Sequence, residues 1–278
     1  MKLRSRVPVT ERLHPAAAHI GASSTKRALE LLHRGDLEAA RAVGRALPSL
    51  ARLARLAAGA LGSGGRLVYA GAGTSGRLGA LDAAECPPTF GISPSRVLAL
   101  VAGGDRALRR AVEGAEDDAV AGRAAVRGAR LRRGDLLVGI SASGTTPYVL
   151  AALAEARRRG AATALVTSNP AARPPVDRRV LLDTGPELVA GSTRLKAGSA
   201  AKMALSLLST AAMIELRRVE AGRMVDLTPT SEKLRRRAVR MVMDLSGASA
   251  ARAEAALGES GWRVRRALAR LESSGRSH

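Results

Sequence analysis

The sequence predicts a doubly wound α/β fold, a parallel sheet with helices on both faces, followed by a small helical unit at the C-terminus. Three observations lead to this prediction. Strand-like runs alternate with helical patterns from about residue 67 to residue 216. Two of these runs, 67–70 and 136–140, open directly into glycine- and hydroxyl-rich loops with a helical pattern behind each. After about residue 228 only helical patterns remain.

Helical patterns flank and separate the predicted strands. Residues 1–14 look irregular, and helical patterns follow at about 22–33 and 36–61 before a Gly-Ser-Gly-Gly segment leads into the first strand. Pro87 and Pro88 are expected to stop the helix behind the first loop, because proline lacks the backbone N–H that a helix uses. The other helices of this part are predicted at 106–129, with a break available at Gly114, at 147–159 and at 192–216.

Five strands and three C-terminal helices complete the prediction. The strands are expected at 67–70, 97–101, 136–140, 164–166 and 180–182. The C-terminal helices are expected at 231–245, 249–257 and 261–272. The chain is therefore divided into an N-terminal helical segment, a sheet domain that holds the site and a helical C-terminal unit, at 1–56, 57–228 and 229–278.

The composition is that of a folded and strongly basic chain. Apolar residues make up 46% of the 278 residues, and the formal net charge is +21. Five of the 45 basic residues are lysines, which leaves 40 arginines. Such a charge is typical of nucleic-acid binding, but the arginines are scattered and the chain has only four Phe, Tyr and Trp residues for base stacking. We therefore expect no nucleic-acid partner, and a field that attracts an anionic substrate.

The residues also limit the compartment and the cofactors. A single cysteine, Cys86, gives neither a disulfide framework nor a metal cluster, and the four histidines lack metal-ligand spacing. We find no signal-peptide pattern and no uncharged apolar run near the length of about 18 residues that crosses a membrane. We expect a cytoplasmic protein with no membrane association, no metal and no cofactor.

Two loops at strand ends predict a phosphate site. Residues 71–76 form a Gly-x-Gly-x-x-Gly loop that presents backbone N–H groups at a helix start. This loop matches the dinucleotide pattern, but Asp105 comes too late after the second strand to bind a ribose. Ser141, Ser143 and Thr146 in the second loop are spaced so that each can donate to one phosphate. Together the loops indicate a small phosphorylated ligand, and ordinary helix caps are the alternative.

Carboxylates and cations near these loops make the predicted binding site a candidate active site. Glu85 lies close to a helix end that the helix dipole disfavours for a negative charge. Glu116 belongs to a run of four carboxylates, whose other members we interpret as a solvated face. Glu187 follows the fifth strand, at the edge where α/β sheets hold ligands. Arg194 and Lys196, near the start of the long helix, indicate either a bound anion or a solvated first turn.

The chain resembles a known family in several segments. Residues 66–91 resemble N-acetylmuramic acid 6-phosphate etherases, and the Glu-Cys-Pro-Pro-Thr-Phe-Gly segment at 85–91 is the most specific part. The likeness covers roughly residues 40–272, although Thr145 stands where the family usually has arginine. The other matching segments are 102–104, 112–117, 143–149, 184–198, 224–226 and 232–234.

This resemblance implies a fold, a reaction and a set of site residues. The fold is of the sugar isomerase (SIS) type with a UBA-like helical C-terminus. The reaction cleaves the D-lactyl ether of N-acetylmuramate 6-phosphate and yields N-acetylglucosamine 6-phosphate and D-lactate. Glu85 resembles the acid that protonates the leaving lactate, and Glu116 resembles the catalytic base. The residues expected to bind substrate are Thr74, Ser75, Ser141, Ser143, Thr146, Glu187, Arg194 and Lys196.

The implied chemistry explains the need for two carboxylates. Removing the C2 proton of the sugar lets the lactate leave by elimination, and water then adds across the double bond. These steps need a base near C2 and an acid near the ether oxygen, without a metal or redox cofactor. Two other functions stay open. A non-catalytic SIS sugar-phosphate sensor need not keep both glutamates, and an aldose–ketose isomerase that uses Glu187 leaves the segment at 85–88 unexplained.

The pattern at 200–214 favours a homodimer. This segment is apolar over wide faces, with Lys202 as its only charge, so the helix is expected to be buried. The resemblance implies a dimer with sites near the subunit interface. The alternative is a monomer that buries the helix within its own layers.

Overall fold

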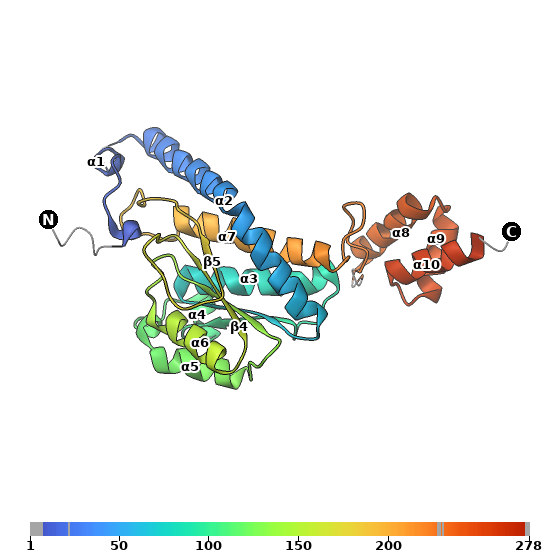
Figure 1. Ribbon diagram of the computed structural model, residues 1–278. Coiled ribbons are helices and arrows are strands. Elements are labelled where there is room, and N and C mark those ends of the chain that lie inside the picture. The colour runs from blue at the N-terminus through green and yellow to red at the C-terminus, as the bar shows by residue number, and fades with distance from the viewer. Residues whose placement is uncertain (1–7, 22, 227–228, 230, 276–278) are drawn as a thin grey trace. The chain divides into compact units, whose positions relative to one another are not determined.

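A parallel five-stranded sheet organises the larger part of the protein (Figure 1). The strand order is β2-β1-β3-β4-β5, and every pairing is parallel. Because the order reverses direction between β1 and β3, this is a doubly wound sheet, as predicted. The strands are β1 (Leu67–Gly71), β2 (Val97–Val101), β3 (Leu136–Ile140), β4 (Ala162–Thr167) and β5 (Arg178–Leu181).

The computed structural model describes residues 8–21, 23–226, 229 and 231–275. Its residues form two compact units, each with a hydrophobic core of its own. The first unit, which contains the sheet, consists of 1–83 and 95–212, and the second consists of 84–94 and 213–278.

Helices cover both faces of the sheet (Figure 1). α5 (Ala119–Gly128) and α6 (Pro147–Arg158) pack on one face, where Val149 and Leu153 approach Gly139 so closely that a Cβ there would lie 2.7 Å from Val149. The other face carries three helices: α2 (Thr25–Gly62), α3 (Gly73–Phe90) and α7 (Lys196–Glu215). The short elements of this unit are η1 (Val9–Glu11), α1 (Ala17–Ile20), α4 (Arg106–Arg109) and η2 (Ala115–Asp117).

Two helix predictions were wrong, each because of packing or capping. The helices predicted at 22–33 and 36–61 are one continuous α2, in which Gly35 is a close contact, since a Cβ there would lie 2.8 Å from Leu188. Pro87 and Pro88 do not stop α3, which continues to Phe90. Only Thr89 and Phe90 follow the prolines in this helix. The helix ends at Gly91 (φ +62°), whose N–H donates to the carbonyl of Pro87 over 3.0 Å.

Other boundaries follow the sequence more closely. The helix expected at 106–129 is interrupted around Gly114, whose φ of +70° favours glycine, and α4, η2 and α5 occupy the range. α7 begins at Lys196 instead of residue 192. The strands predicted at 164–166 and 180–182 correspond to β4 and β5, with boundaries shifted by one or two residues.

The second unit contains the three predicted C-terminal helices, α8 (Glu232–Ser246), α9 (Ala250–Glu259) and α10 (Val264–Gly275). Ser231 and Ser249 cap α8 and α9, since their side chains accept hydrogen bonds from backbone N–H groups in the first turns. The helices share a core that includes Val242, Leu257 and Val264. This confirms the small helical unit expected from the sequence.

By length and composition α7 could cross a membrane, the one such helix among the residues the structure describes. However, 56% of its most apolar window is buried in the fold. Its Ser209 donates to the carboxylate of Asp82 on α3 over 3.0 Å. Burial against a neighbouring helix explains the apolar composition of α7.

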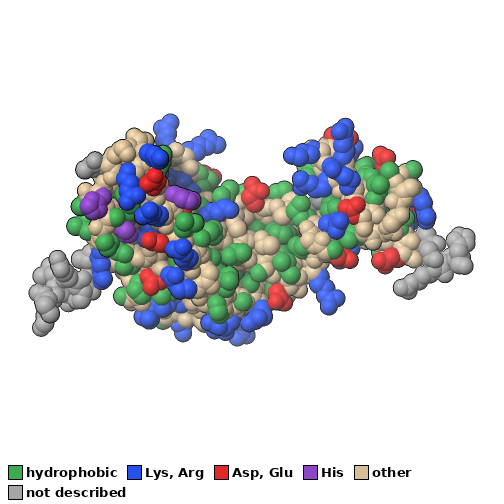
Figure 2. Space-filling view, turned by 90° about the horizontal axis from the view of Figure 1, so that it is seen from above, with side chains coloured by type: hydrophobic (Ala, Val, Ile, Leu, Met, Phe, Trp, Pro, Cys, Tyr) green, Lys and Arg blue, Asp and Glu red, His purple; other side chains and the backbone are tan. Residues whose placement is uncertain are grey.

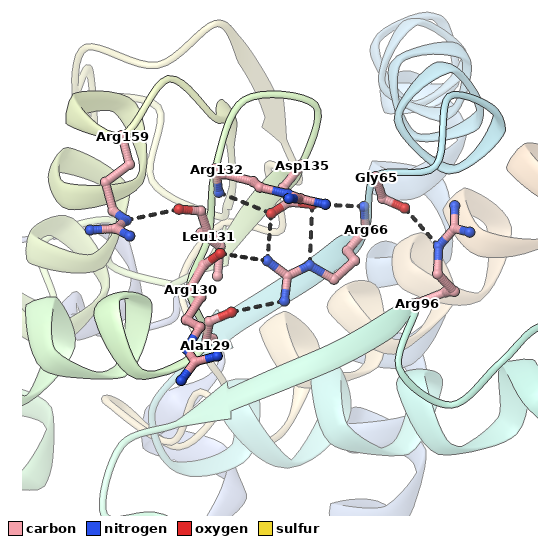
Figure 3. A network of polar contacts seen from close by, with 9 residues as sticks. All are labelled: Gly65, Arg66, Arg96, Ala129, Arg130, Leu131, Arg132, Asp135 and Arg159. Atoms are coloured by element: carbon pink, nitrogen blue, oxygen red, sulfur yellow. Dashed lines mark hydrogen bonds and ion pairs between the residues drawn. The ribbon is translucent and has the colours of Figure 1, made fainter.

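An ion-pair network joins the strand starts at the edge opposite the glycine loops (Figure 3). The carboxylate of Asp135 is 2% exposed and accepts three hydrogen bonds from Arg66, at 2.6, 3.0 and 3.2 Å, and one from the N–H of Arg132. The Arg66 guanidinium also donates to the carbonyls of Ala129 and Arg130. These bonds hold β1 and β3 in register, because Arg66 and Asp135 directly precede them.

Lys and Arg side chains are spread over the visible surface of each unit, among apolar and acidic side chains (Figure 2). Part of the arginine content is used inside the fold. Arg66 is one example, and Arg96, whose Nε donates to the carbonyl of Gly65 over 2.8 Å, is another (Figure 3). Some of the arginines therefore satisfy backbone carbonyls at loop and strand ends.

Candidate functional site

The candidate site lies at the carboxyl edge of the sheet, where β1 and β3 are neighbours. The register pairs Gly71, the last residue of β1, with Ile140, the last residue of β3. The two predicted loops therefore begin side by side. β1 connects to β2 on one side and β3 to β4 on the other, which opens the crevice in which doubly wound sheets bind ligands.

The first loop is tight because α3 begins almost directly after β1. Gly73 has a φ of +53°, and a Cβ on Gly71 would lie 2.6 Å from the backbone nitrogen of Gly76. Thr74 and Ser75 occupy the first turn of α3 and are half-buried. N–H groups in the first turn of a helix have no partner within the helix, so this turn can bind an anion.

The second loop holds its predicted hydroxyls in one cluster. The hydroxyl oxygens of Ser141 and Thr146 are 2.8 Å apart, and those of Ser141 and Ser143 are 3.4 Å apart. Thr145, the residue that departs from the family pattern, donates to the Ser143 oxygen from its hydroxyl over 2.9 Å and from its N–H over 3.2 Å. Gly144 closes the turn with a φ of +69°. The cluster offers several O–H donors to one anion.

Residues at the end of β4 support this loop, and the sequence analysis did not include them. The side-chain amide of Asn169 donates to the carbonyl of Ser143 over 2.7 Å, and the Thr167 hydroxyl donates to the carbonyl of Ala142. Thr167 and Asn169 are buried. A polar Thr-Ser-Asn-Pro run at a strand's carboxyl end is the signal that could have identified them.

The first loop also contacts the long helix. A small cavity of about 10 Å³ is lined by Ser75, by Ser168 at the end of β4, and by Thr193 and Ala197 near the start of α7. A Cβ on Gly198 would lie 3.5 Å from the methyl group of Thr74, so α7 and α3 approach closely at their first turns. Ser75 and Thr74 therefore face the same region as the strand ends.

Glu187 caps α7. Its side chain is fully buried, and its two carboxylate oxygens accept hydrogen bonds from the N–H groups of Lys196 and Ala197 over 3.0 and 2.9 Å. Burial raises the pKa of Glu187, although these two bonds oppose the rise. The cations near the start of this helix suggested that an anion is bound there. The carboxylate of Glu187 is such an anion, and it belongs to the protein itself.

Lys196 and Arg194 have different surroundings. Lys196 is 2% exposed, and its ammonium group donates to Glu38 and to the carbonyl of Pro186. Arg194 is exposed and lines an open pocket of about 460 Å³ together with Thr74. The role of both cations in binding substrate stays a prediction.

The two glutamates with predicted catalytic roles are both exposed, and they belong to different units. Glu116 lies on η2, in the segment between β2 and α5 of the first unit. Glu85 lies on α3, in the part of that helix assigned to the second unit. Of the carboxylates next to Glu116, Asp118 accepts a hydrogen bond from the N–H of Ala121 over 2.8 Å and caps α5. Asp118 is exposed, as the interpretation of a solvated face expects, and it is in addition a helix cap.

Comparison with known proteins gives the family. A family model described as "Glucokinase regulatory protein N-terminal SIS domain" matches residues 50–157. An N-acetylmuramic acid 6-phosphate etherase from Deinococcus radiodurans is 48% identical over 265 residues, which cover 95% of this chain and 87% of that protein. The etherase of Serratia proteamaculans is 45% identical over 94% of this chain and 88% of its own length. The chain belongs to the N-acetylmuramic acid 6-phosphate etherase family.

Solved structures confirm the SIS fold of this etherase family member. A proposed phosphosugar isomerase involved in capsule formation in Bacteroides fragilis superimposes with a TM-score of 0.53, at 19% identity, over 70% of this chain and 92% of that one. An Escherichia coli protein, solved with a bound ligand, gives a TM-score of 0.50, at 17% identity, over 72% and 97%. The SIS match at 50–157 contains both loops and both glutamates.

Proposed function

We propose that this protein is an N-acetylmuramic acid 6-phosphate etherase, a carbon–oxygen lyase that releases D-lactate from the phosphorylated amino sugar. The observation that carries the proposal is the identity of 44–48% with etherases over about 95% of the chain. The hydroxyl cluster at the β1–β3 edge supports a phosphosugar substrate. We place the reaction in the cytoplasm, with no nucleic-acid or membrane partner.

The reaction we propose is an elimination followed by a hydration. A base takes the C2 proton, the C2–C3 double bond forms, and the C3–O bond breaks as an acid protonates the departing lactate oxygen. Water then adds its hydroxyl to C3 and a proton to C2, which gives N-acetylglucosamine 6-phosphate. We assign the base to Glu116 and the acid to Glu85. Both are carboxylates, so their pKa values in the complex must differ for the two roles.

We propose that the two loops bind the 6-phosphate. Hydroxyls of Ser141, Ser143 and Thr146 donate to it, and so do Ser75 and the first N–H groups of α3. The proposal is supported by the 2.8 and 3.4 Å spacings within the cluster, which match a group that accepts several hydrogen bonds. No positive side chain is needed within this cluster, because an ionised phosphate makes strong hydrogen bonds to neutral donors.

We further propose that the enzyme is a homodimer and that Glu85 serves the site of the other subunit. Both proposed catalytic glutamates are exposed, so each is accessible to a second subunit. Several large apolar side chains are exposed and available to a subunit interface, including Leu37 (45%), Leu47 (50%) and Leu81 (48%). A two-fold dimer would exchange Glu85 between subunits symmetrically.

The first experiment is an assay for D-lactate after incubation with N-acetylmuramate 6-phosphate. We expect Glu116→Gln and Glu85→Gln to lower kcat by at least about 100-fold, the scale of acid–base catalysis. Near-normal turnover in either variant would refute the role of that glutamate. A protein that binds the substrate and releases no lactate would instead be a sensor, and the family model that matches residues 50–157 is named for a regulatory protein.

Co-expression of the two variants tests the shared site. A mixed dimer of Glu85→Gln and Glu116→Gln subunits has one intact site if Glu85 acts across the interface, and none if it acts within its own chain. Recovery of activity in mixed dimers supports the shared site, and its absence refutes it. Light scattering provides the control, because a mass near 28.7 kDa would refute the dimer itself.

A further inference from the structure

The pocket that Arg194 lines contains cationic and apolar side chains to which the proposed phosphate site assigns no role. It lies beside the first turn of α3, where Thr74 and Leu78 form one wall, and it extends along α7. Its full lining is Asp36, Thr74, Leu78, Arg194, Gly198, Ser199, Lys202 and Met203. All of these residues belong to the first unit.

The pocket offers two cations and an apolar wall. Arg194 and Lys202 are exposed. Lys202 also acts on the Asp82 carboxylate of α3, since burial raises the pKa of Asp82 and the charge of Lys202 opposes that rise. The single carboxylate in the lining, Asp36, already accepts a hydrogen bond from the Ser199 hydroxyl over 3.0 Å. With Arg194 and Lys202 positive and Asp36 negative, the lining of the pocket has a formal charge of +1. Leu78 and Met203 supply its apolar surface.

This combination fits the part of the substrate that the reaction removes. The lactyl group consists of a carboxylate, a methyl group and the ether oxygen, and its carboxylate is the second anion of the substrate besides the phosphate. Thr74 lines the pocket and stands next to Ser75 of the phosphate loop, so one sugar could place its phosphate at the loops and its lactyl group here. A carboxylate without a cation would be costly to desolvate.

We propose that Lys202, with Arg194, binds the lactyl carboxylate, and that Leu78 and Met203 contact the lactyl methyl group. This rests on the proposed etherase function. It makes Lys202 a specificity-determining residue, because it distinguishes N-acetylmuramate 6-phosphate from sugar phosphates that carry no acid on O3. Gly198, which also lines the pocket, lets α3 and α7 approach closely there, since a Cβ on it would lie 3.5 Å from the methyl group of Thr74.

The test compares two substrates in two proteins. One substrate is N-acetylmuramate 6-phosphate, and the other is its lactamide analogue, in which the carboxylate is a neutral carboxamide. Lys202→Met keeps most of the aliphatic stem and removes the charge. We expect it to lower kcat/KM for the acid by about 10- to 100-fold, the range for one hydrogen bond to a charged group, and to change kcat/KM for the amide little. The comparison cancels the intrinsic difference between the two leaving groups.

Controls separate this proposal from the proposed function. Lys202→Arg should retain the preference for the acid, and Lys26→Met, a charge removal at an exposed position on α2, should leave both substrates unaffected. Wild-type protein that releases no D-lactate would refute the etherase function. Wild-type protein that releases lactate while Lys202→Met keeps the full preference for the acid would refute the subsite alone. Equal losses for both substrates would also refute it, because they would place Lys202 against the phosphate or the sugar.

Discussion

Replacing Asp135 by asparagine removes the carboxylate on which Arg66 and the N–H of Arg132 converge (Figure 3). The shape of the side chain is nearly unchanged, so the substitution tests charge and hydrogen bonding. It leaves the Arg66 guanidinium, 21% exposed, without its anion. The site is at the edge of the sheet opposite the candidate active site, so stability can be measured apart from catalysis.

The expected loss of stability follows from burial. Removing one member of a buried ion pair costs about 3–5 kcal/mol, because the remaining charge is left unpaired. Arg66 keeps some contact with solvent and retains the carbonyls of Ala129 and Arg130 as acceptors. We therefore expect the lower end, about 3 kcal/mol, which for a domain of this size corresponds to a Tm lower by roughly 6–12 °C.

Urea unfolding followed by circular dichroism measures this loss, and the pH dependence tests its cause. Hydrogen bonds from Arg66 and Arg132 hold the pKa of Asp135 below its ordinary value despite burial. The unfolded value is about 3.9, so the stabilisation is complete above that pH and is lost as the pH falls through the lower folded pKa. The difference between wild type and Asp135→Asn should therefore shrink in acid.

A double-mutant cycle with Arg66→Met decides whether the pair itself is responsible. We expect a coupling of more than about 1 kcal/mol, since directly paired charges are not additive. Arg52→Met, at an exposed position on α2, is the matched control and should change stability little. Additive effects of Asp135→Asn and Arg66→Met, or a pH-independent difference, would contradict our explanation.

Three further substitutions test the site. Ser143→Ala should weaken binding of N-acetylmuramate 6-phosphate by about 1.5–3 kcal/mol in calorimetry, and equally tight binding of the unphosphorylated sugar would show that the loop has another role. Glu187→Gln should lower the urea stability by about 1–2 kcal/mol, because one N–H at the start of α7 loses its carboxylate acceptor, and an unchanged midpoint would contradict the capping role. Gly144→Ala should cost about 1–3 kcal/mol and disturb phosphate binding, because its φ is +69° and the new Cβ would lie 2.3 Å from that of Ala172. Gly59→Ala on α2, where a Cβ meets nothing within 4 Å, is the control for Gly144→Ala and should not destabilise.

Local patterns were enough to predict the α/β alternation, both loops and the three C-terminal helices. The reason is that these features depend on neighbours in the chain. A glycine loop between an apolar run and a helical pattern has few alternative conformations. The hydroxyls of the second loop were identified for the same reason, and the structure brings Ser141, Ser143 and Thr146 together as the spacing indicated.

Contacts between distant segments decided the rest. Gly35 does not interrupt α2 because α2 packs against Leu188 at this position. Glu187 caps α7 because the fold brings its carboxylate to the backbone N–H of Lys196, nine residues later in the chain. No local pattern reports either contact, since each joins groups that only the folded chain brings together. The same holds for the strand order: the sequence by itself determined that β1 and β3 each end in a loop rich in glycine and hydroxyl groups, but only the tertiary structure made the two strands neighbours, through the register that pairs Gly71 with Ile140.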